Sequence, residues 1–290
     1  MLLITSLIWG FAFVAQRAGM EYLGPFFFNA IRFALGTLWL LPLIYFQRNT
    51  RSKLSDCFRK NWIRDGLWLG INLFLAASLQ QIGIIQTTAG KAGFITGLYV
   101  ILVPLFGIVL KKTTGLLTWL GALLALIGLY FLSFRENIIF ARGDFLVFIS
   151  AFFWAIHVLA VDHFVEKIPA LLLALYQFLF CSFFSFISAL FFEKLEWSAI
   201  PPAAIPIVYT GLLSVGIGYT LQVLAQKEAH PSHAAIILSL ESVFAVIGGW
   251  ILLHESLSSR ELLGCLLMLS GMIFSQLRSG KNPESSSTGP

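Results

Sequence analysis

The sequence predicts an all-α integral membrane protein with ten transmembrane helices, arranged as two inverted five-helix repeats with both termini in the cytoplasm. Hydrophobic residues make up 58% of the 290-residue chain and charged residues only 11%, against about 25% charged residues in soluble domains. Apolar runs close to membrane length recur along the chain, and the second half repeats the first about 143 residues later. Because five is an odd number of spans, the second repeat is expected to lie upside down relative to the first, as in many secondary transporters.

Polar segments divide the chain into ten apolar runs, each a candidate for a membrane-spanning helix, which needs roughly 20 mostly apolar residues. The expected spans are 2–16, 27–46, 67–85, 92–110, 116–134, 145–161, 170–192, 205–225, 233–253 and 262–276. The first run has no basic leader and matches the sixth, so we interpret it as a span rather than a signal peptide.

Basic residues favour a cytoplasmic N-terminus. With that orientation the segment between the second and third runs is also cytoplasmic, and it contains Arg48, Arg51, Lys53, Arg59, Lys60 and Arg64. Positively charged loops stay on the cytoplasmic side, so we expect both termini inside, in a bacterial inner membrane. Because this charge gathers in one loop, the formal net charge of +5 does not indicate a nucleic-acid partner.

The two repeats are expected over 1–135 and 143–278, followed by a Ser-, Gly- and Pro-rich tail over 279–290 that is expected to be disordered. Residues recur between the halves at offsets of 142 to 145. The matches include Trp9 with Trp154, Pro25 with Pro169, Phe33 with Phe178, Gln80 with Gln222, Leu98 with Leu240, and Gly128 with Gly271. A nearly constant offset that includes rare Trp, Gln and Pro residues indicates duplication rather than chance matching of Leu- and Phe-rich stretches.

The chain resembles the EamA branch of the drug/metabolite transporter superfamily in several short motifs. These are Leu7-Ile8-Trp9-Gly10-Phe11, Asn29-Ala30-Ile31-Arg32-Phe33, Gly90-Lys91-Ala92-Gly93-Phe94 and Ser239-Leu240-Glu241. The resemblance implies ten helices, cytoplasmic termini, and a central cavity lined by the first, third, fourth, sixth, eighth and ninth helices. The family usually has proline after the glutamate, whereas this chain has Ser242, so its ninth helix lacks the proline that would kink it.

Glu241 is the acidic residue deepest within an expected span. A carboxylate in hydrocarbon is costly unless it faces a cavity or a partner, or is protonated. Glu241 is therefore either a proton-coupling or cation-recognising group, or a protonated or paired carboxyl that fastens two helices. Tyr99 occupies the matching position in the first repeat. We expect a binding cavity with the carboxylate of Glu241 on one side and the phenol of Tyr99 opposite. Ser242, which follows Glu241 in the sequence, is a further candidate for this cavity.

Arg32 is the basic residue inside an expected span, about one turn from the outer end of the second run. One interpretation is that its side chain snorkels to the outer interface or caps carbonyls of a neighbouring helix. The other is that it faces the pathway and pairs with an acidic substrate. Its counterpart in the second repeat is the neutral Gln177, which favours the structural role.

Two polar side chains at matching positions mark the third and eighth spans. Ser214, Gly218 and Gln222 recur every four residues and so share one stripe of the eighth span, and Gln80 is the counterpart of Gln222 on the third. Buried amides need partners. We expect these residues either to contact substrate or to hydrogen-bond between helices.

Aromatic residues mark the first and sixth spans. Trp9 and Trp154 lie at matching positions, where they either stack on an aromatic or cationic substrate or pack between helices. His157 shares a helix face with Trp154, and it is either a proton relay or a helix-to-helix hydrogen-bond donor.

The sequence therefore predicts a secondary transporter that exports a small organic solute, such as an amino acid or a related metabolite or drug, by alternating access. Proton coupling is a hypothesis, and a lipid-carrier flippase or passive facilitator on the same scaffold is the alternative. No cofactor is expected, and the chain has no G-x-x-x-x-G-K-[ST] phosphate loop.

An integral membrane enzyme is a remote alternative. Its candidate residues are His230, His233 and Glu228, but Pro231 separates the histidines and further ligands are lacking, so neither a metal site nor enzymatic activity is expected. Glycines also recur at spacing seven, at 121 and 128 and again at 264 and 271. Such small residues allow close helix packing, either within the bundle or in a homodimer.

Overall fold

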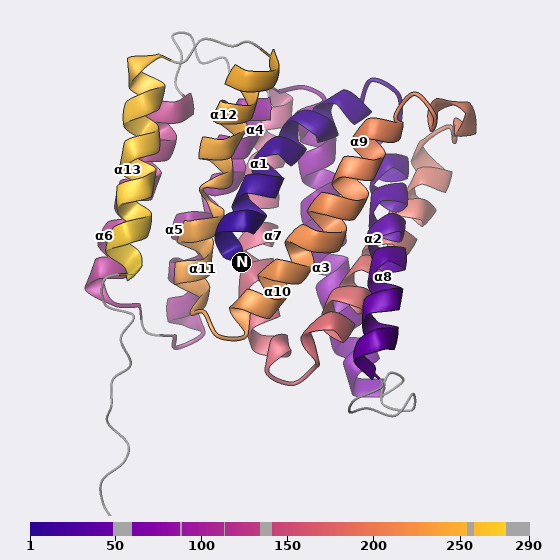
Figure 1. Cartoon of the computed structure of the whole chain (residues 1–290), viewed down its shortest axis with the longest axis horizontal. Coiled ribbons are helices and arrows are strands. Elements are labelled where there is room, and N and C mark those ends of the chain that lie inside the picture. The colour runs from indigo at the N-terminus through magenta and orange to yellow at the C-terminus, as the bar shows by residue number, and fades with distance from the viewer. Residues whose placement is uncertain (49–59, 88, 113, 134–140, 254–257, 277–290) are drawn as a thin grey trace, which may run out of the picture.

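The computed structural model describes residues 1–48, 60–87, 89–112, 114–133, 141–253 and 258–276. Helices dominate these residues, and no β-strand occurs among them (Figure 1). The expected all-α class is thus confirmed. The tail expected over 279–290 and several of the basic residues between the second and third spans lie outside the described residues.

The elements follow the apolar runs of the sequence. The first half forms α1 (Leu2–Gly19), α2 (Pro25–Arg48), α3 (Lys60–Ile84), α4 (Ala89–Gly97), α5 (Tyr99–Val109) and α6 (Leu116–Ser133). The second half forms α7 (Arg142–Val165), α8 (Ala170–Phe192), the short 3₁₀ turn η2 (Trp197–Ala199), α9 (Ala204–Val208), the π-helix η3 (Tyr209–Tyr219), α10 (Thr220–Gln226), α11 (Pro231–Leu238), α12 (Glu241–Leu253) and α13 (Ser259–Gln276).

Within the described residues, eight helical stretches are long and apolar enough to cross a membrane. They are Leu2–Gly19, Pro25–Phe46, Asn61–Ile84, Ala89–Val109, Arg142–Val165, Ala170–Phe192, Ala204–Gln226 and Pro231–Gly248. The apolar part of α6, Leu116–Phe131, is shorter, and α13 carries Arg260 and Glu261 at its start and Gln276 at its end. A multi-pass membrane protein is confirmed, while the count of ten spans remains a prediction.

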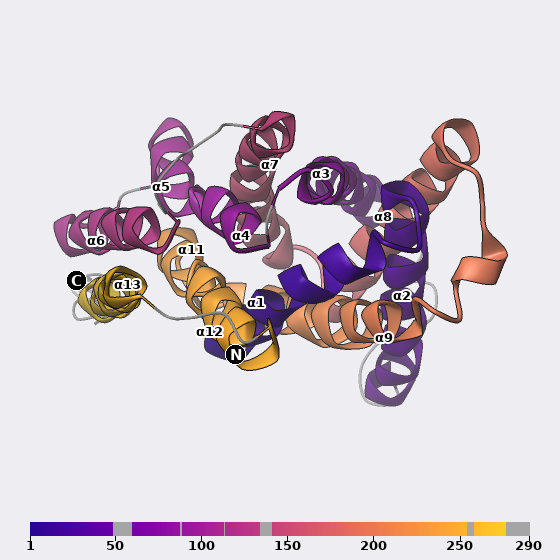
Figure 2. The ribbon, with the colours of Figure 1, turned by 90° about the horizontal axis from the view of Figure 1, so that it is seen from above.

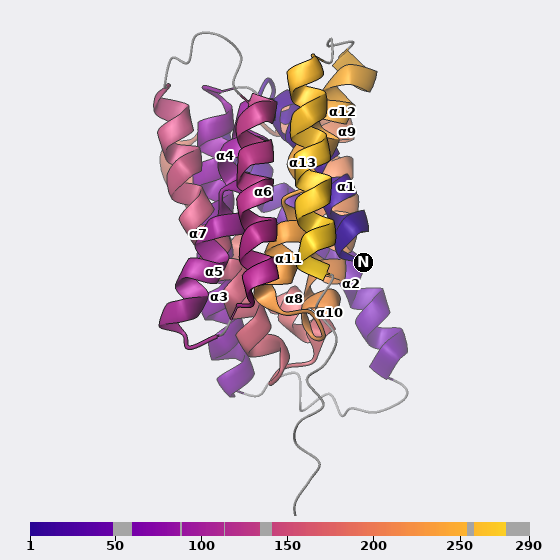
Figure 3. The same cartoon turned by 90° about the vertical axis from the view of Figure 1, so that its left-hand side faces the viewer.

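The helices form an elongated bundle, which Figures 2 and 3 show from above and from one end. Helices α6 and α13 lie side by side at one end of the long axis, and α2 packs on α8 at the other. The contacts in between come in matched sets: α1 packs on α12 as α7 does on α5, and α1 packs on η3 as α7 does on α3. Helix α2 likewise packs on η3 as α8 does on α3. Each helix thus contacts the half of the chain to which it does not belong.

Glycines allow α6 and α13 to approach closely. A Cβ atom at Gly121 would lie 2.6 Å from the carbonyl oxygen of Gly271, and one at Gly128 would lie 2.6 Å from that of Gly264. These close approaches are the packing that spacing seven predicted on both helices. Both helices belong to the same chain, so these glycines pack within the bundle. This is the first of the two roles that the sequence left open for them.

Two spans are interrupted near their middle by a tightened turn. Leu98 separates α4 from α5, and its amide bonds to the carbonyl of Ile95 at 3.2 Å. Ser239 and Leu240 separate α11 from α12, and the amide of Leu240 bonds to the carbonyl of Ile237 at 3.2 Å. These bonds span three residues instead of four, as in a 3₁₀ turn. The interruptions fall at matching positions of the two halves.

The interruption of the ninth span forms without the proline that the family resemblance implies at this place. Ser242 stands in that place, and its hydroxyl donates a hydrogen bond of 2.8 Å to the carbonyl of Gly93 on α4. A proline could not reach across in this way, because it has no side-chain donor. The interruption is therefore stabilised by a hydrogen bond from the Ser242 side chain to α4, and not by the restricted backbone of a proline.

Candidate functional site

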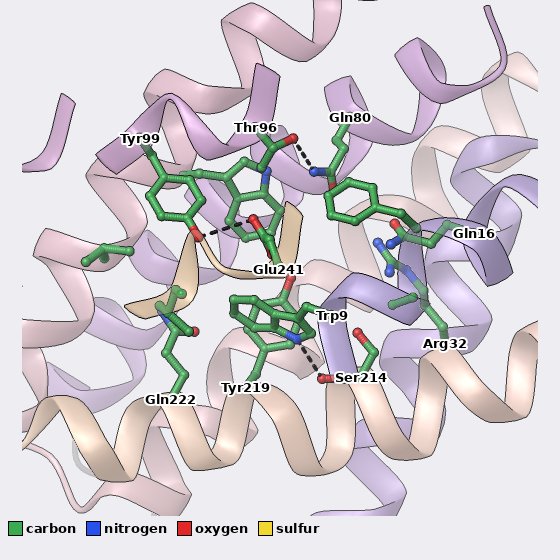
Figure 4. Close-up of a pocket in the computed structure, with 15 residues that line it drawn as sticks. Trp9, Gln16, Arg32, Gln80, Thr96, Tyr99, Ser214, Tyr219, Gln222 and Glu241 are labelled. Carbon is green, nitrogen blue, oxygen red and sulfur yellow. Dashed lines mark hydrogen bonds between the residues drawn. The ribbon is translucent and has the colours of Figure 1, made fainter. Parts of the chain in front are cut away.

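A cavity lies beside the two tightened turns and is lined by both halves of the chain (Figure 4). The space between its lining atoms, including its open side, is about 460 Å³. Its lining residues are Trp9, Ala12, Phe13, Gln16, Arg32, Gln80, Thr96, Tyr99, Trp154, Val158, Ser214, Tyr219, Gln222, Leu238 and Glu241. Of the site residues predicted from the sequence, eight are in this set, and His157 and Ser242 are not.

Glu241 and Tyr99 are each the first residue of the second half of an interrupted span. The phenol of Tyr99 donates a hydrogen bond to Oε1 of Glu241, with 3.2 Å between the oxygens. Both side chains are 3% exposed. The expectation that they face each other across the cavity is wrong, because the two tightened turns touch and bring the groups together on one side (Figure 4).

Arg32 is buried at another part of the cavity wall. Its side chain is 2% exposed, so the interpretation as a side chain that snorkels to the interface is wrong. Its Nε donates to Oδ1 of Asn29 at 2.8 Å, and the guanidinium carbon lies 4.9 Å from the ring centre of Phe33 and 5.8 Å from that of Phe28. Its Nη2 has no hydrogen-bond partner among the described residues.

Gln80 and Gln222 line the cavity but do not bond to each other. Gln80 donates to the hydroxyl of Thr96 at 2.8 Å and so joins α3 to α4. Gln222 donates to Oε1 of Gln226 at 2.9 Å, and Gln226 in turn donates to the carbonyl of Val158 on α7 at 2.9 Å. Gln80 therefore bonds between helices, whereas Gln222 reaches α7 only through Gln226. Substrate contact by either amide stays a prediction.

The wall opposite α4 is built by the π-helix η3. Trp9 on α1 donates from Nε1 to the carbonyl of Ser214 at 3.2 Å, and its ring covers Gly218, where a Cβ atom would lie 2.7 Å from Nε1. π-Helical turns are rare and recur at functional sites. The wider turn changes which residues face inward, so that Tyr219 lines the cavity in place of Gly218.

Tyr219 is a cavity residue that the sequence reasoning missed. Its ring centre lies 4.6 Å from that of Trp9 and 6.1 Å from that of Trp154, to which it is nearly parallel at 25°. The prediction that Ser214, Gly218 and Gln222 share one stripe assumed a regular α-helix, in which aligned positions are about four residues apart. Gly216 and Gly218 precede Tyr219 in the sequence, but glycine does not by itself predict a π-helix, so the sequence carries no clear signal for this position.

His157 lies behind the cavity wall rather than in it. It is fully buried, and its Nε2 lies 2.7 Å from Oε1 of Gln177 on α8. This contact fits the helix-to-helix alternative. Ser242 is similarly occupied with the carbonyl of Gly93.

Several polar atoms of the cavity-lining residues lack partners. Oε1 of Gln16, Nη2 of Arg32, Nε1 of Trp154 and Oε1 of Gln222 are buried and make no hydrogen bond within the described part of the chain. Most buried polar groups in proteins are paired with protein or ordered water. A pocket with aromatic walls and a few converging polar groups is the usual form of a small-molecule site.

Two ion pairs connect the α4–α5 pair to α7, one near each end. Lys91 pairs with Asp144 at 2.6 Å, and Asp144 also accepts from the hydroxyl of Thr87 at 2.6 Å. At the other end Lys112 pairs with Asp162. Ion pairs near both ends of the interrupted α4–α5 span therefore favour a fixed packing of this span against α7.

The two histidines weighed for an enzyme have local structural partners. His230 precedes α11, and its Nδ1 accepts a hydrogen bond of 3.3 Å from the amide of Ser232. Burial lowers the pKa of His230, which favours the neutral ring that can accept this bond. His233 lies 3.4 Å from the hydroxyl of Thr118. Among the described residues no group of three or more His, Cys, Asp or Glu side chains could hold a metal ion.

Comparison with known proteins identifies the family. A sequence model of the EamA-like transporter family matches residues 1–134 and again residues 141–276. The chain belongs to this family. The EamA resemblance read from the sequence motifs is thereby confirmed.

Relatives of this EamA-like chain are named as transporters. A protein of Archaeoglobus fulgidus named "Uncharacterized transporter" is 32% identical over 282 residues, which cover 96% of this chain and 85% of that protein. "Uncharacterized transporter YoaV" of Bacillus subtilis is 24% identical over 281 residues, 92% of each chain. These names and the family indicate a membrane transporter rather than an enzyme.

A solved structure shares the fold of this EamA-like chain. Described as "Crystal structure of protein", it superposes with a TM-score of 0.79 and covers 95% of each chain at 17% identity. At this identity the likeness concerns the fold alone.

Proposed function

We propose that this EamA-like protein is a secondary transporter that moves a small organic solute by alternating access through the cavity beside the two interrupted spans. The observation that carries the proposal is the position of this cavity. It lies where two helices break at matching positions and is lined by residues from both halves. Transporters with inverted repeats bind substrate at such discontinuous helices, between the two repeats.

Ten spans in two inverted five-helix repeats, with both termini cytoplasmic, are part of the proposal. The matched contacts between the halves support it, as does the double match of the family model. So do two contacts between residues at equivalent positions, Tyr99 with Glu241 and Phe33 with Phe178, since equivalent residues can touch only near an axis that relates the halves. The basic residues before α3 favour the cytoplasmic assignment.

The solute is an amino acid or a related metabolite or drug, and export from a bacterial cell across the inner membrane is the proposed direction. The aromatic walls of the cavity and its few converging polar groups suit a molecule of this kind. Glu241 is the group proposed to couple transport to protons. It is buried, faces the cavity, and has Tyr99 as its hydrogen-bond partner, so a change in its charge would alter the cavity directly.

The test compares solutes inside and outside cells that express the wild-type protein or Glu241→Gln, without choosing a compound in advance. A solute that leaves cells only with the wild type identifies the substrate and supports export. Comparable membrane insertion of both proteins is verified by fractionation. If neither protein changes any solute in either direction, in cells or in loaded proteoliposomes, the proposal of a small-solute transporter is wrong.

A further inference from the structure

Arg32 presents a buried positive charge to the cavity, and no carboxylate of the residues that the structure describes opposes it. The ion pairs found in the described part of the chain use Arg64, Lys91 and Lys112. The other ionisable group of the cavity wall that could oppose it, Glu241, bonds to Tyr99 instead. Figure 4 shows the guanidinium beside Gln16, with the carboxyl of Glu241 directed toward Tyr99.

An uncompensated charge in a low-dielectric interior is costly, and proteins normally pair it. The aromatic rings of Phe33 and Phe28 offset part of this cost, because a guanidinium is attracted to a ring face. Such stacking engages the flat faces of the guanidinium and leaves its edge free for hydrogen bonds. On that edge Nε is engaged by Asn29, while Nη2 has no partner.

We propose that Arg32 binds the carboxylate of the transported solute, so that the substrate class is a small organic carboxylate. A planar guanidinium matches the two oxygens of a carboxylate and is the side chain best suited to that recognition. The apolar part of the solute packs on the aromatic wall formed by Trp9, Tyr219 and Trp154. The inference rests on the proposed transport function.

The two halves of the chain differ at the position of Arg32. At the position equivalent to Arg32 the second half has Gln177, which is fully buried and lies against His157. The charge is therefore present on one side of the pseudo-symmetric bundle. A solute held by this charge is bound in one orientation, with its carboxylate toward α2.

The experiment measures ligand binding to the purified full-length protein in detergent. The probes are apolar L-amino acids with a free carboxylate, such as leucine and phenylalanine, and the primary amides of the same amino acids. The readout is the increase in unfolding temperature with probe concentration, which gives an apparent affinity. The variants are Arg32→Gln, Arg32→Lys and, as a control, Arg260→Gln. Arg260 also lies over two aromatic rings, Tyr130 and Phe131, but does not line the cavity.

We expect a free carboxylate to stabilise the wild type and the matching amide to have little effect. Loss of a charged hydrogen bond predicts that Arg32→Gln weakens binding about ten- to a hundredfold. Arg32→Lys retains part of the affinity, and Arg260→Gln binds as the wild type does. If amides bind as tightly as acids, or Arg32→Gln binds the acid normally, the proposal is wrong. The acid–amide comparison needs only the wild type, so it decides even if Arg32→Gln does not fold.

A separate measurement distinguishes this inference from the transport function. Wild-type proteoliposomes are loaded with a mixture of acidic, neutral and basic metabolites, and release is followed by mass spectrometry. Release of neutral or basic solutes alone supports transport and overturns the role of Arg32. Tight binding of acids without release of any solute supports the carboxylate site and overturns transport.

Discussion

Tyr99 and Glu241 lie 142 residues apart in the chain, and the phenol of one donates a hydrogen bond to the carboxyl of the other. That separation is also the spacing at which Gln80 is matched by Gln222 and Leu98 by Leu240. The two residues thus hold equivalent positions in the two halves and meet where the halves touch. One position carries a phenol and the other a carboxyl, so the contact is chemically asymmetric at the centre of a nearly symmetric arrangement.

Replacing Glu241 by Gln is expected to abolish solute flux driven by a proton gradient while exchange of solute for solute continues. The amide keeps the shape and the hydrogen-bonding capacity toward Tyr99, but it cannot gain or lose a proton. The measurement is gradient-driven accumulation and counterflow in the same proteoliposomes. Glu196→Gln, on an exposed part of the chain, serves as the control. Normal accumulation by Glu241→Gln would end the coupling hypothesis.

Replacing Tyr99 by Phe is expected to lower the free energy of unfolding by about 1–3 kcal/mol, because the buried carboxyl of Glu241 loses its donor. The ring itself stays and the packing is little changed. Thermal unfolding in detergent measures the effect. Tyr22→Phe is a suitable control, since Tyr22 is 42% exposed. Equal unfolding temperatures for the two variants would show that the Tyr99 hydroxyl contributes no stability.

Gly10 allows α1 to pack directly on the interrupted span. A Cβ atom there would lie 2.5 Å from Cβ of Phe244 and 2.7 Å from the carbonyl oxygen of Glu241. We expect Gly10→Ala to cost about 1–3 kcal/mol by overpacking and to slow transport, because α1 can no longer sit at the break. Gly90→Ala is the control, since apart from the neighbouring backbone of its own helix no described atom lies within 4 Å of the added Cβ. A Gly10→Ala protein as stable and active as Gly90→Ala would contradict the close approach.

The sequence was sufficient for the class of fold and for several residues of the cavity wall, because both follow from hydropathy and repetition. Apolar runs located the helices, and the repeat placed Tyr99 opposite Glu241 in the alignment of the halves. The sequence could not show that Tyr99 and Glu241 touch, since their contact depends on how the two tightened turns pack. It also missed Tyr219, because a change from α- to π-helix alters the facing residues without a clear change in composition.

Arg32 shows a second limit of the sequence. A charged residue near the end of an apolar run is compatible with a lipid interface and with a protein interior, and hydropathy treats both alike. Its burial depends on the packing of α2 against α8 and η3, which are distant in the chain. Such tertiary contacts have no local signature, so the position of the guanidinium could be learned only from the structure.

Asp144 connects α7 to the segment before α4 more firmly than a surface charge would. Its side chain is fully buried and accepts hydrogen bonds from Lys91 at 2.6 Å, from Thr87 at 2.6 Å and from the amide of Ala141 at 2.8 Å. We expect Asp144→Asn to lower the free energy of unfolding by about 1.5–3 kcal/mol, because bonds to a charged acceptor are stronger than those to an amide.

The matched control for Asp144→Asn is Asp65→Asn. Asp65 pairs with Arg64, whose side chain is 71% exposed, and such exposed pairs contribute only about 0–1 kcal/mol. Chemical or thermal unfolding of both variants in the same detergent, at low and at high salt, separates the two cases. Salt is expected to remove what little Asp65 contributes and to leave most of the larger Asp144 effect in place, because the Asp144 carboxylate is fully buried and a partly buried pair is screened less than an exposed one. Equal, salt-sensitive losses for both variants would show that the Asp144 cluster behaves as an ordinary surface pair and does not hold α7 to α4.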